Sequence, residues 1–341
     1  MVRRNRLHVF FHRDFDGICS AAVFLASVSR TGAVSGHEVE LVPVDYDVKP
    51  TWAGTVLPKQ SAIVDFLYHP AAEWWFDHHP STFVKAEWEA SFKPDDRHVW
   101  NTRYKSCPGL ILDSLRDEVL RANLKARFRE HVIWSDIIDS AQYSSPTQVV
   151  EAVEPALRVN LSLAVDGDPR YFVFLVMCLE QRPLDEVARL EEVSRRYKKA
   201  MSWQKLALAY MKKVAEVGEG VAFFDLRNHG EMFHRYAPYY FWPDIKFAVA
   251  VYSNGQGFRV TVSSNPWEDY DGPDLATLCE QYGGGGHRRV AAVANLEKRQ
   301  ALRVAREMAR KLRGEEPYIE QLPFRQQILR EHRSISDESG H

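Results

Sequence analysis

Short apolar runs alternate with helical patterns through the first 80 residues of this 341-residue chain. Residues 7–11, 39–44, 61–66 and 73–76 have the length and composition of buried strands. Residues 17–29 have helical spacing, and residues 109 to about 177 read mostly as helix. This alternation predicts an α/β domain with a mainly parallel sheet flanked by helices.

The pattern changes in the second half of the chain. A stretch rich in Glu, Arg, Lys, Leu and Ala, from about 184 to 214, predicts a long connecting helix that Gly218-Glu219-Gly220 ends. Three strands are then expected at 221–224, 245–252 and 258–262, with a hairpin turn at 254–257 and a helix at 274–281. These elements predict a smaller α/β C-terminal domain.

Composition limits the classes of protein that the chain can belong to. The sequence is 45% apolar and 26% charged, which is ordinary for a globular protein, and its formal net charge of -2 gives no global basic field. The four cysteines are spread out without a C-x-x-C pair, which argues against a zinc ribbon or a disulfide scaffold and fits the cytoplasm. No apolar run reaches the length of a membrane span, so we expect no membrane association.

Acidic and imidazole side chains follow three of the predicted strands. Because the carboxyl ends of parallel strands meet at one edge of a sheet, we expect these side chains to converge. Such a group needs counter-charge, and divalent cations supply it. Mixed carboxylate and imidazole ligands suit manganese, and also iron, cobalt or magnesium. The side chains are His12, Asp14 and Asp16 after the first strand, Asp65 after the third, and Asp77, His78 and His79 after the fourth.

A further acid is expected from the helical half. Asp136 and Asp139 both stand in an apolar helical context, where a carboxylate is costly unless it is paired or bound to metal. Each acidic feature also has a purely structural interpretation. Asp14 and Asp16 can cap a helix, Asp136 can be an exposed acid on an amphipathic helix, and residues 77–79 can form a surface loop.

Four consecutive glycines at 283–286 precede His287, Arg288 and Arg289. A glycine run can be a flexible connector, but cationic residues directly after it are unusual for a linker. Bare backbone N–H groups beside a helix N-terminus form a nest for phosphate, and His287 and the arginines add donors. The sequence therefore predicts a phosphate-binding loop.

In this order, the motifs resemble those of the DHH phosphoesterase superfamily, and the glycine stretch followed by Val290-Ala291-Ala292 resembles its DHH-associated C-terminal domain. The resemblance spans nearly the whole chain. It implies a DHH catalytic domain at 1–200, a connecting helix and linker at 201–220, a substrate-binding domain at 221–328 and a polar tail at 329–341. It also implies an active site in the cleft between the two domains.

The resemblance implies roles for individual residues. Two Mn²⁺ ions, or Mg²⁺ or Co²⁺, would be held with Asp77 or Asp65 bridging, and His79 would sit near the scissile phosphate. Asp77, His78 and His79 would form the catalytic triplet, and a metal-activated hydroxide would attack the phosphate ester. The implied metal ligands are His12, Asp14, Asp16, Asp65, Asp77, His78 and Asp136, and the implied substrate contacts are Gly284, Gly285, Gly286, His287 and Arg288.

The chain departs from the superfamily pattern at two places. The metal-binding His that many relatives carry four residues before the first Asp is replaced by Phe10, which leaves His12 as the nearest imidazole. The S-x-R-S stretch of many relatives reads Val262-Ser263-Ser264-Asn265, so the phosphate-binding arginine is either missing or replaced by Arg259, Arg288 or Arg289. Asp16 is followed by glycine, as in RecJ-like members.

The leading hypothesis is a manganese-dependent phosphodiesterase that acts on short RNA or DNA, or on a small nucleotide, in the manner of the oligoribonuclease-like members. Compact size and near-neutral charge favour short substrates, because long strands need a basic, aromatic channel. The alternatives are a single-strand-specific RecJ-like exonuclease, a 3'-phosphoadenosine 5'-phosphate phosphatase and a non-catalytic nucleotide-binding module. The sequence leaves open whether the chain forms a homodimer. Base stacking is weighed for an aromatic stretch of the second domain, Tyr236, Tyr239, Tyr240 and Trp242, against core packing.

Overall fold

The computed structural model describes residues 6–31, 37–253, 255 and 257–315. Two positions of the predicted hairpin turn, Asn254 and Gln256, and the polar tail at 329–341 lie outside the described residues. The chain divides into two compact units. Unit 1 comprises the described residues up to 143 together with 152–201, and unit 2 comprises residues 144–151 and the described residues from 202 onward.

Unit 1 is built on a five-stranded sheet in the order β2-β1-β3-β4-β5, in which every neighbouring pair is parallel. Its order confirms the expected α/β class. Residues at the carboxyl ends of β1, β3 and β4 therefore share one edge of the sheet. The strands are β1 (Arg6–His12), β2 (Glu38–Val44), β3 (Ser61–Val64), β4 (Trp74–Asp77) and β5 (His98–Trp100).

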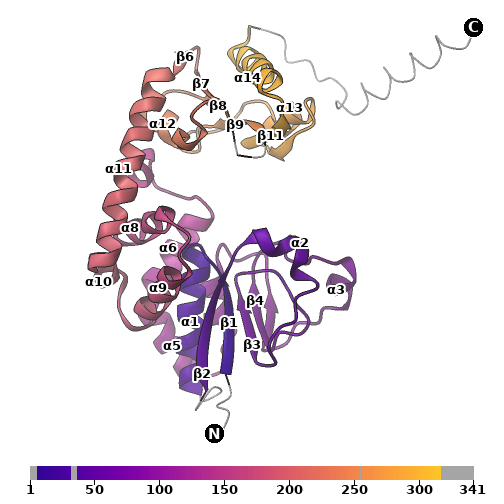
Figure 1. The fold of residues 1–341 in the computed structure, drawn as a ribbon, viewed down its shortest axis with the longest axis vertical. Helices are drawn as coiled ribbons and strands as arrows, with labels where there is room; N and C mark the ends of the chain where they lie inside the picture. The colour runs from indigo at the N-terminus through magenta and orange to yellow at the C-terminus, as the bar shows by residue number, and fades with distance from the viewer. Residues whose placement is uncertain (1–5, 32–36, 254, 256, 316–341) are drawn as a thin grey trace, which may run out of the picture. The chain divides into compact units, whose positions relative to one another are not determined.

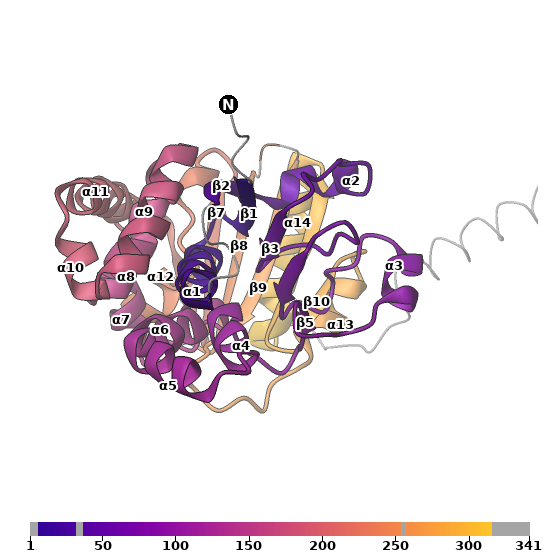
Figure 2. The ribbon, with the colours of Figure 1, turned by 90° about the horizontal axis from the view of Figure 1, so that it is seen from below.

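Helix α1 (Phe15–Thr31) packs on one face of this sheet and is itself covered by further helices, as Figure 2 shows. A continuous apolar core joins them, because α1 presents buried residues on nearly all sides. The helices that contact α1 are α4 (Cys107–Asp113), α5 (Glu118–Arg127), α6 (Arg129–Asp139) and α9 (Pro169–Gln181). Helix α10 (Leu184–Arg189) packs on α9 and on α8 (Pro155–Ser162), which η2 (Leu163–Val165) follows.

The opposite face of the sheet carries an aromatic cluster. Trp75 is fully buried there, and its indole N–H donates to the carbonyl oxygen of Phe66 at 2.9 Å. Trp52 packs edge-on against Phe66 in the same cluster. Most of the tryptophans near the predicted site are thus core residues. The short helices on this side are η1 (Tyr46–Val48), α2 (Lys49–Trp52) and α3 (Ala86–Ser91).

Unit 2 holds a separate mixed sheet of six strands in the order β10-β11-β9-β8-β7-β6, where only β7 and β8 are parallel. The antiparallel pairing of β8 with β9 confirms the predicted hairpin. Its strands are β6 (Glu216–Gly218), β7 (Val221–Leu226), β8 (Phe247–Ser253), β9 (Phe258–Ser264), β10 (Gly285–His287) and β11 (Val290–Leu296). Its helices are α7 (Pro146–Glu151), η3 (Gly230–Met232), α12 (Ala237–Phe241), α13 (Leu275–Glu280) and α14 (Lys298–Arg313).

The predicted long helix is present as α11 (Glu191–Val214), which carries residues of both units (Figure 1). The predicted helical stretch began at 184, but Leu190 interrupts it with a non-helical ψ of 141° and separates the short α10. One segment of unit 2 lies between two unit 1 segments in the sequence. Helix α7 belongs to unit 2, where it packs on α12, and the Tyr240 hydroxyl donates to Glu151 at 3.3 Å.

Candidate metal centre

The junction between β1 and α1 places the first two acids. Asp14 accepts a hydrogen bond from the Gly17 N–H at 2.8 Å, so it does cap the helix, as the structural interpretation required. Asp16, at the start of α1, is only 2% exposed and points instead into the protein, where it accepts from the Cys107 N–H at 3.0 Å. A Cβ at Gly17 would lie 2.1 Å from the carbonyl oxygen of His12, so this tight turn requires glycine.

Asp65 follows β3 and is completely buried. Its φ of 54° is left-handed, a conformation that aspartate tolerates better than most residues. The backbone is held there by a hydrogen bond from its N–H to the carbonyl oxygen of Phe76 at 2.8 Å. Neither carboxylate oxygen of Asp65 has a hydrogen-bond partner, which is costly for a buried acid.

The Asp77-His78-His79 triplet begins on the last residue of β4 and continues just beyond it. Nδ1 of His78 lies 3.2 Å from the carbonyl oxygen of Tyr104, which can only accept, so Nδ1 carries the proton. The lone pair of Nε2 then faces three carboxylates, those of Asp16 at 3.3 Å, Asp65 at 3.4 Å and Asp139 at 3.7 Å. Acceptors facing one another in this way call for a cation between them.

Three overlapping groups of side chains have potential ligand atoms within 4.8 Å of one another. Asp65 belongs to two of them and His78 to two, so the groups form one continuous cluster at the carboxyl edge of the sheet. The groups are His12, Asp14 and Asp65; Asp16, His78 and Asp139; and Asp65, His78 and His79. Hard carboxylate oxygens combined with imidazoles, and buried oxygens that lack partners, fit a divalent cation.

The electrostatics of the protein alone show how poorly this cluster is satisfied. Burial, helped by the charge of Asp16, raises the pKa of Asp65 well above its usual value. Burial also raises the pKa of Asp139 to about 6. Burial alone would lower the pKa of His78, but the neighbouring carboxylates of Asp16 and Asp65 outweigh it and raise that pKa to about 11. Without a metal ion, the cluster therefore holds protons to balance its charge.

Two of the implied metal ligands lie outside these groups. Asp77 is fully buried, but its carboxylate accepts from Nδ1 of His79 at 2.8 Å, which orients that ring. Asp136 accepts from the Ser106 hydroxyl at 2.5 Å. Asp139, its neighbour one turn along α6, joins the cluster in its place. The sequence offered Asp136 and Asp139 as candidates, but helical spacing alone does not tell which one faces the sheet edge.

The glycine run differs from the expected helix-terminal nest. It follows the C-terminus of α13, and Gly285–His287 forms the edge strand β10 against β11. A Cβ at Gly286, whose φ is 150°, would lie 2.5 Å from Cα of Ala291. Close approach of two strands is therefore a sufficient reason for glycine there. His287 and Arg288 are exposed at this edge.

Arg289 lies beside the serine pair that interrupts the superfamily pattern. Its Nε donates to the Ser264 hydroxyl at 3.0 Å, and its Nη2 donates to the carbonyl oxygen of Glu268 at 2.8 Å. It also lines a small pocket of about 130 Å³ with Arg235 and Tyr236. Of the aromatic stretch weighed for stacking, Tyr239 also lines this pocket, but it is buried and hydrogen-bonded to Ser263 at 2.7 Å, which leaves Tyr236 as the more accessible ring there.

No protein-family model and no curated protein matches the sequence. Solved structures do resemble the fold. A pGpG-specific phosphodiesterase, PggH from Vibrio cholerae, has a TM-score of 0.68 at 15% identity, covering 91% of this chain and 100% of that one. RecJ from Thermus thermophilus in complex with Mn²⁺ has a TM-score of 0.53 at 14% identity, covering 92% of this chain and 53% of that one.

The DHH domain of a protein assigned to a family of ribosomal proteins has a TM-score of 0.52 at 14% identity, and the match covers 89% of this chain and 86% of that one. The fold thus places the chain among two-unit α/β proteins with a parallel N-terminal sheet. More narrowly, the fold is similar to that of a structure described as a DHH domain, which is the fold that the sequence motifs implied. Among the described helices, none combines the length and apolar character needed to cross a membrane.

Proposed function

We propose that this chain is a metal-dependent phosphodiesterase that hydrolyses short oligonucleotides or small nucleotides. The observation that carries the proposal is the carboxylate of Asp65, which is buried, has no hydrogen-bond partner on either oxygen and belongs to two ligand groups. A carboxylate in that position can bridge two ions, the arrangement suited to attack on a phosphate. The fold is that of proteins whose names include a phosphodiesterase and an exonuclease.

The cluster in the structure favours an assignment of ligands that differs from the one the sequence resemblance implied. His12, Asp14 and Asp65 would hold one ion, and Asp16, His78 and Asp139 the other, with Asp65 shared. Manganese is our first choice, since carboxylates and imidazoles both suit it. Ions bound there would lower the pKa of an attacking water and neutralise charge on the phosphate. Cys107 and Tyr104 steady the second group through their hydrogen bonds to Asp16 and His78.

His79 is assigned to the substrate and Asp77 to orienting it. The hydrogen bond from Nδ1 to Asp77 leaves Nε2 of His79 available to a phosphate oxygen. Burial lowers the pKa of His79, but the bond to Asp77 outweighs it and raises the pKa, which favours the protonated, donating ring. Asp77 is thereby a positioning residue rather than the bridging ligand that was one of the two sequence-based choices.

Unit 2 carries a phosphate-binding surface of its own in this proposal. Gly284, Gly285, Gly286, His287 and Arg288 supply backbone and cationic donors, and Arg289 takes the place of the arginine that relatives carry between their serines. The similarity to a pGpG-specific phosphodiesterase over its whole length favours a dinucleotide substrate over a long strand.

Hydrolysis of bis-p-nitrophenyl phosphate by the metal-stripped chain, before and after addition of Mn²⁺, tests the proposed reaction. We expect turnover only with metal, and almost none in Asp65→Asn. A chain that binds Mn²⁺ in calorimetry yet turns over no ester would instead be a nucleotide-binding module. A panel of dinucleotides, short RNA, single-stranded DNA, a cyclic dinucleotide and 3'-phosphoadenosine 5'-phosphate then assigns the substrate.

A further inference from the structure

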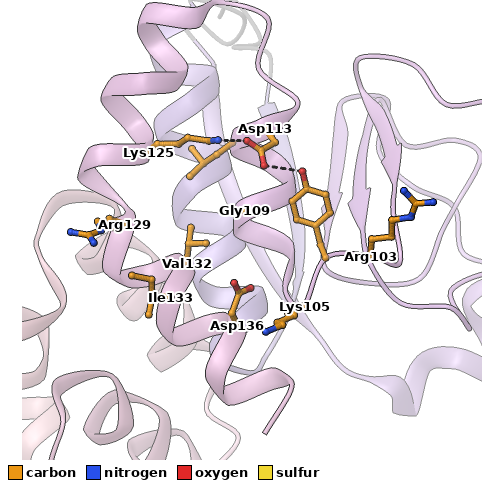
Figure 3. Close-up of a pocket in the computed structure, with 11 residues that line it drawn as sticks. Arg103, Lys105, Gly109, Asp113, Lys125, Arg129, Val132, Ile133 and Asp136 are labelled. Carbon is orange, nitrogen blue, oxygen red and sulfur yellow. Dashed lines mark hydrogen bonds and ion pairs between the residues drawn. The ribbon is translucent and has the colours of Figure 1, made fainter. Parts of the chain in front are cut away.

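A pocket of about 570 Å³ lies in unit 1 between α4, α5, α6 and the segment just before α4 (Figure 3). No function has been assigned to it so far. Its volume is in the range of small-molecule sites. Its floor is apolar, its ends are charged, and two arginines stand at its edges. The lining residues are Arg103, Tyr104, Lys105, Gly109, Leu112, Asp113, Lys125, Arg129, Val132, Ile133 and Asp136.

The floor of the pocket is apolar where α4 packs closely against α6. Gly109 contributes no side chain, and a Cβ there would already lie 3.3 Å from Cγ1 of Val132. The ring of Tyr104 forms one side, held by a hydrogen bond from its hydroxyl to Asp113 at 2.8 Å. Ile133 is an exposed apolar side chain, with 44% of its surface accessible. A planar base laid on this floor would cover apolar surface that water now contacts.

The charged groups at the two ends differ in what they leave unsatisfied. At one end, Asp113 pairs with Lys125 and with the Tyr104 hydroxyl, so its charge is balanced. At the other end, Asp136 accepts one hydrogen bond, from Ser106, and retains further acceptor sites. Lys105 stands beside Asp136 in Figure 3. Its ammonium bonds one acceptor, Gln142 at 2.7 Å, and has donors to spare.

A carboxylate beside an ammonium group matches the edge of one nucleobase. Guanine offers two adjacent donors, N1–H and the N2 amino group, next to the acceptor O6. Asp136 can accept from both donors while Lys105 donates to O6. Adenine has an acceptor where guanine has N1–H, so it would face the carboxylate with a mismatch that costs free energy.

The edges of the pocket carry unused positive charge. Among the described residues, the guanidinium groups of Arg103 and Arg129 have neither an ion pair nor a hydrogen bond, and both side chains are exposed. The two side chains lie on opposite sides of the pocket in Figure 3, so their charges would attract a phosphate without both contacting it. We propose that this pocket binds a guanine nucleotide, with Asp136 and Lys105 selecting the base and Arg103 and Arg129 attracting the phosphate.

The pocket and the metal centre share one segment of chain. The carbonyl oxygen of Tyr104 accepts from His78, and the Cys107 N–H donates to Asp16, while Tyr104 and Ser106 also belong to the pocket or contact it. A nucleotide there is thus either the guanine end of the substrate or a separate effector. Only this last distinction rests on the proposed function.

Equilibrium dialysis in EDTA, which keeps metal ions out of the centre, tests binding directly. We expect the chain to bind GMP about tenfold more tightly than AMP, and Asp136→Asn to bring the two within about threefold. Arg103→Ala combined with Arg129→Ala should weaken GMP about tenfold and leave guanosine unchanged. The matched control is Arg182→Ala with Lys59→Ala, two exposed cations of unit 1 away from the pocket.

Equal affinity for GMP and AMP in the wild-type chain, or GMP binding that Asp136→Asn leaves unchanged, would overturn the proposal. Ile133→Trp fills the pocket from an exposed position and serves as a second variant, because it disturbs no side-chain hydrogen bond. It should also abolish GMP binding with an unchanged circular dichroism spectrum. Undiminished GMP binding in this variant would place the nucleotide elsewhere.

Kinetics with Mn²⁺ then separate the two sources of the nucleotide. If the pocket holds the guanine end of the substrate, the pocket variants should raise KM for a guanylyl dinucleotide about tenfold without changing the rate on bis-p-nitrophenyl phosphate. If the pocket holds an effector, added GMP should change the rate on bis-p-nitrophenyl phosphate in the wild-type chain and leave the rate of Ile133→Trp unaffected. Failure of the proposed hydrolysis would show as no turnover of any ester, while the EDTA result would stand by itself.

Discussion

The carboxyl edge of the unit 1 sheet and the glycine edge of the unit 2 sheet carry the two conspicuous motifs of the chain, and they satisfy their polar groups in opposite ways. At the first edge, Asp65 and His78 are buried with atoms that lack partners. At the second, Arg289 already donates to Ser264 and to a backbone carbonyl, and the glycines pack β10 against β11.

The difference teaches how far each motif can specify chemistry. A buried carboxylate cluster that balances its charge only by holding protons costs more free energy than packing alone would justify, so it points to a cation. Exposed glycines and cations are cheap to keep, and strand packing explains part of them. The metal centre therefore rests on buried polar atoms that lack partners, whereas the phosphate role of unit 2 rests only on groups that are able to bind phosphate.

The largest effect should follow from removing the shared carboxylate. Asp65→Asn should reduce Mn²⁺-dependent hydrolysis of bis-p-nitrophenyl phosphate on the order of 10³-fold, because one residue serves both ligand groups. The metal-free variant should melt at a higher temperature than the wild-type chain, since a buried, poorly satisfied acid has gone. The exposed Asp47→Asn serves as control. Wild-type activity in Asp65→Asn would break the contrast between the two edges.

The next effect distinguishes the two acids of α6. Asp139→Asn should lower hydrolysis about 10²-fold and reduce the rise in melting temperature that Mn²⁺ produces. Asp136→Asn should change the rate on the same small ester less than about threefold, because its carboxylate contacts Ser106 and the pocket. The reverse ranking of the two variants would restore the sequence-based choice of Asp136 as the ligand.

Acid should weaken unit 1 through a histidine outside the metal centre. Burial lowers the pKa of His131, on α6, to about 4, and the side chain is 2% exposed. Between pH about 6.5 and about 4 the unfolded chain binds a proton that the folded unit does not, so stability falls as pH falls, by up to ~3 kcal/mol. Chemical denaturation at pH about 7 and about 4.5, in EDTA, should show a smaller loss for His131→Leu.

The exposed His229→Leu in unit 2 is the control for that experiment. Burial lowers the pKa of His234 in unit 2 to about 4 as well, so the His131 variant should protect only the transition of unit 1. Equal acid sensitivity of wild type and His131→Leu would show that other groups dominate the response.

The smallest effect is expected at the glycine edge. His287→Ala should raise KM for a dinucleotide about tenfold, with little change for bis-p-nitrophenyl phosphate, which is too small to reach a remote contact. The side chain is exposed at the end of β10, so the melting temperature should hold. Equal losses on both substrates would contradict a role in remote phosphate binding and remove the functional half of the comparison.

Much of the fold could be predicted because its signals are local. The runs at 61–66 and 73–76 became β3 and β4 with ends shifted by a residue or two, and the parallel sheet then brought Asp65 beside the triplet. The edge strands β5, β6 and β10 were not predicted, and neither was β11. Three residues carry too little periodicity to stand out, and β10 consists mostly of glycine, which has low strand propensity.

Within the candidate site, residue types and order in the chain were sufficient to expect a cluster of His12, Asp14, Asp16, Asp65 and His78. They could not rank Asp139 above Asp136, because that choice depends on the rotation of α6 about its axis, which is set by packing against α1 and α4. Nor could they show that one carboxylate oxygen of Asp77 contacts Nδ1 of His79 while the other is buried without a hydrogen-bond partner.

The amino-acid sequence alone thus establishes the α/β class, the strand-end acids and the chemistry they suit, because periodicity and side-chain type are properties of short segments. The tertiary structure decides which side chains form the ligand groups that share Asp65. It also decides that the glycine run forms an edge strand and that Tyr104 and Asp136 line a common pocket. Those outcomes depend on helix rotation, strand register and burial, which arise only when distant segments pack together.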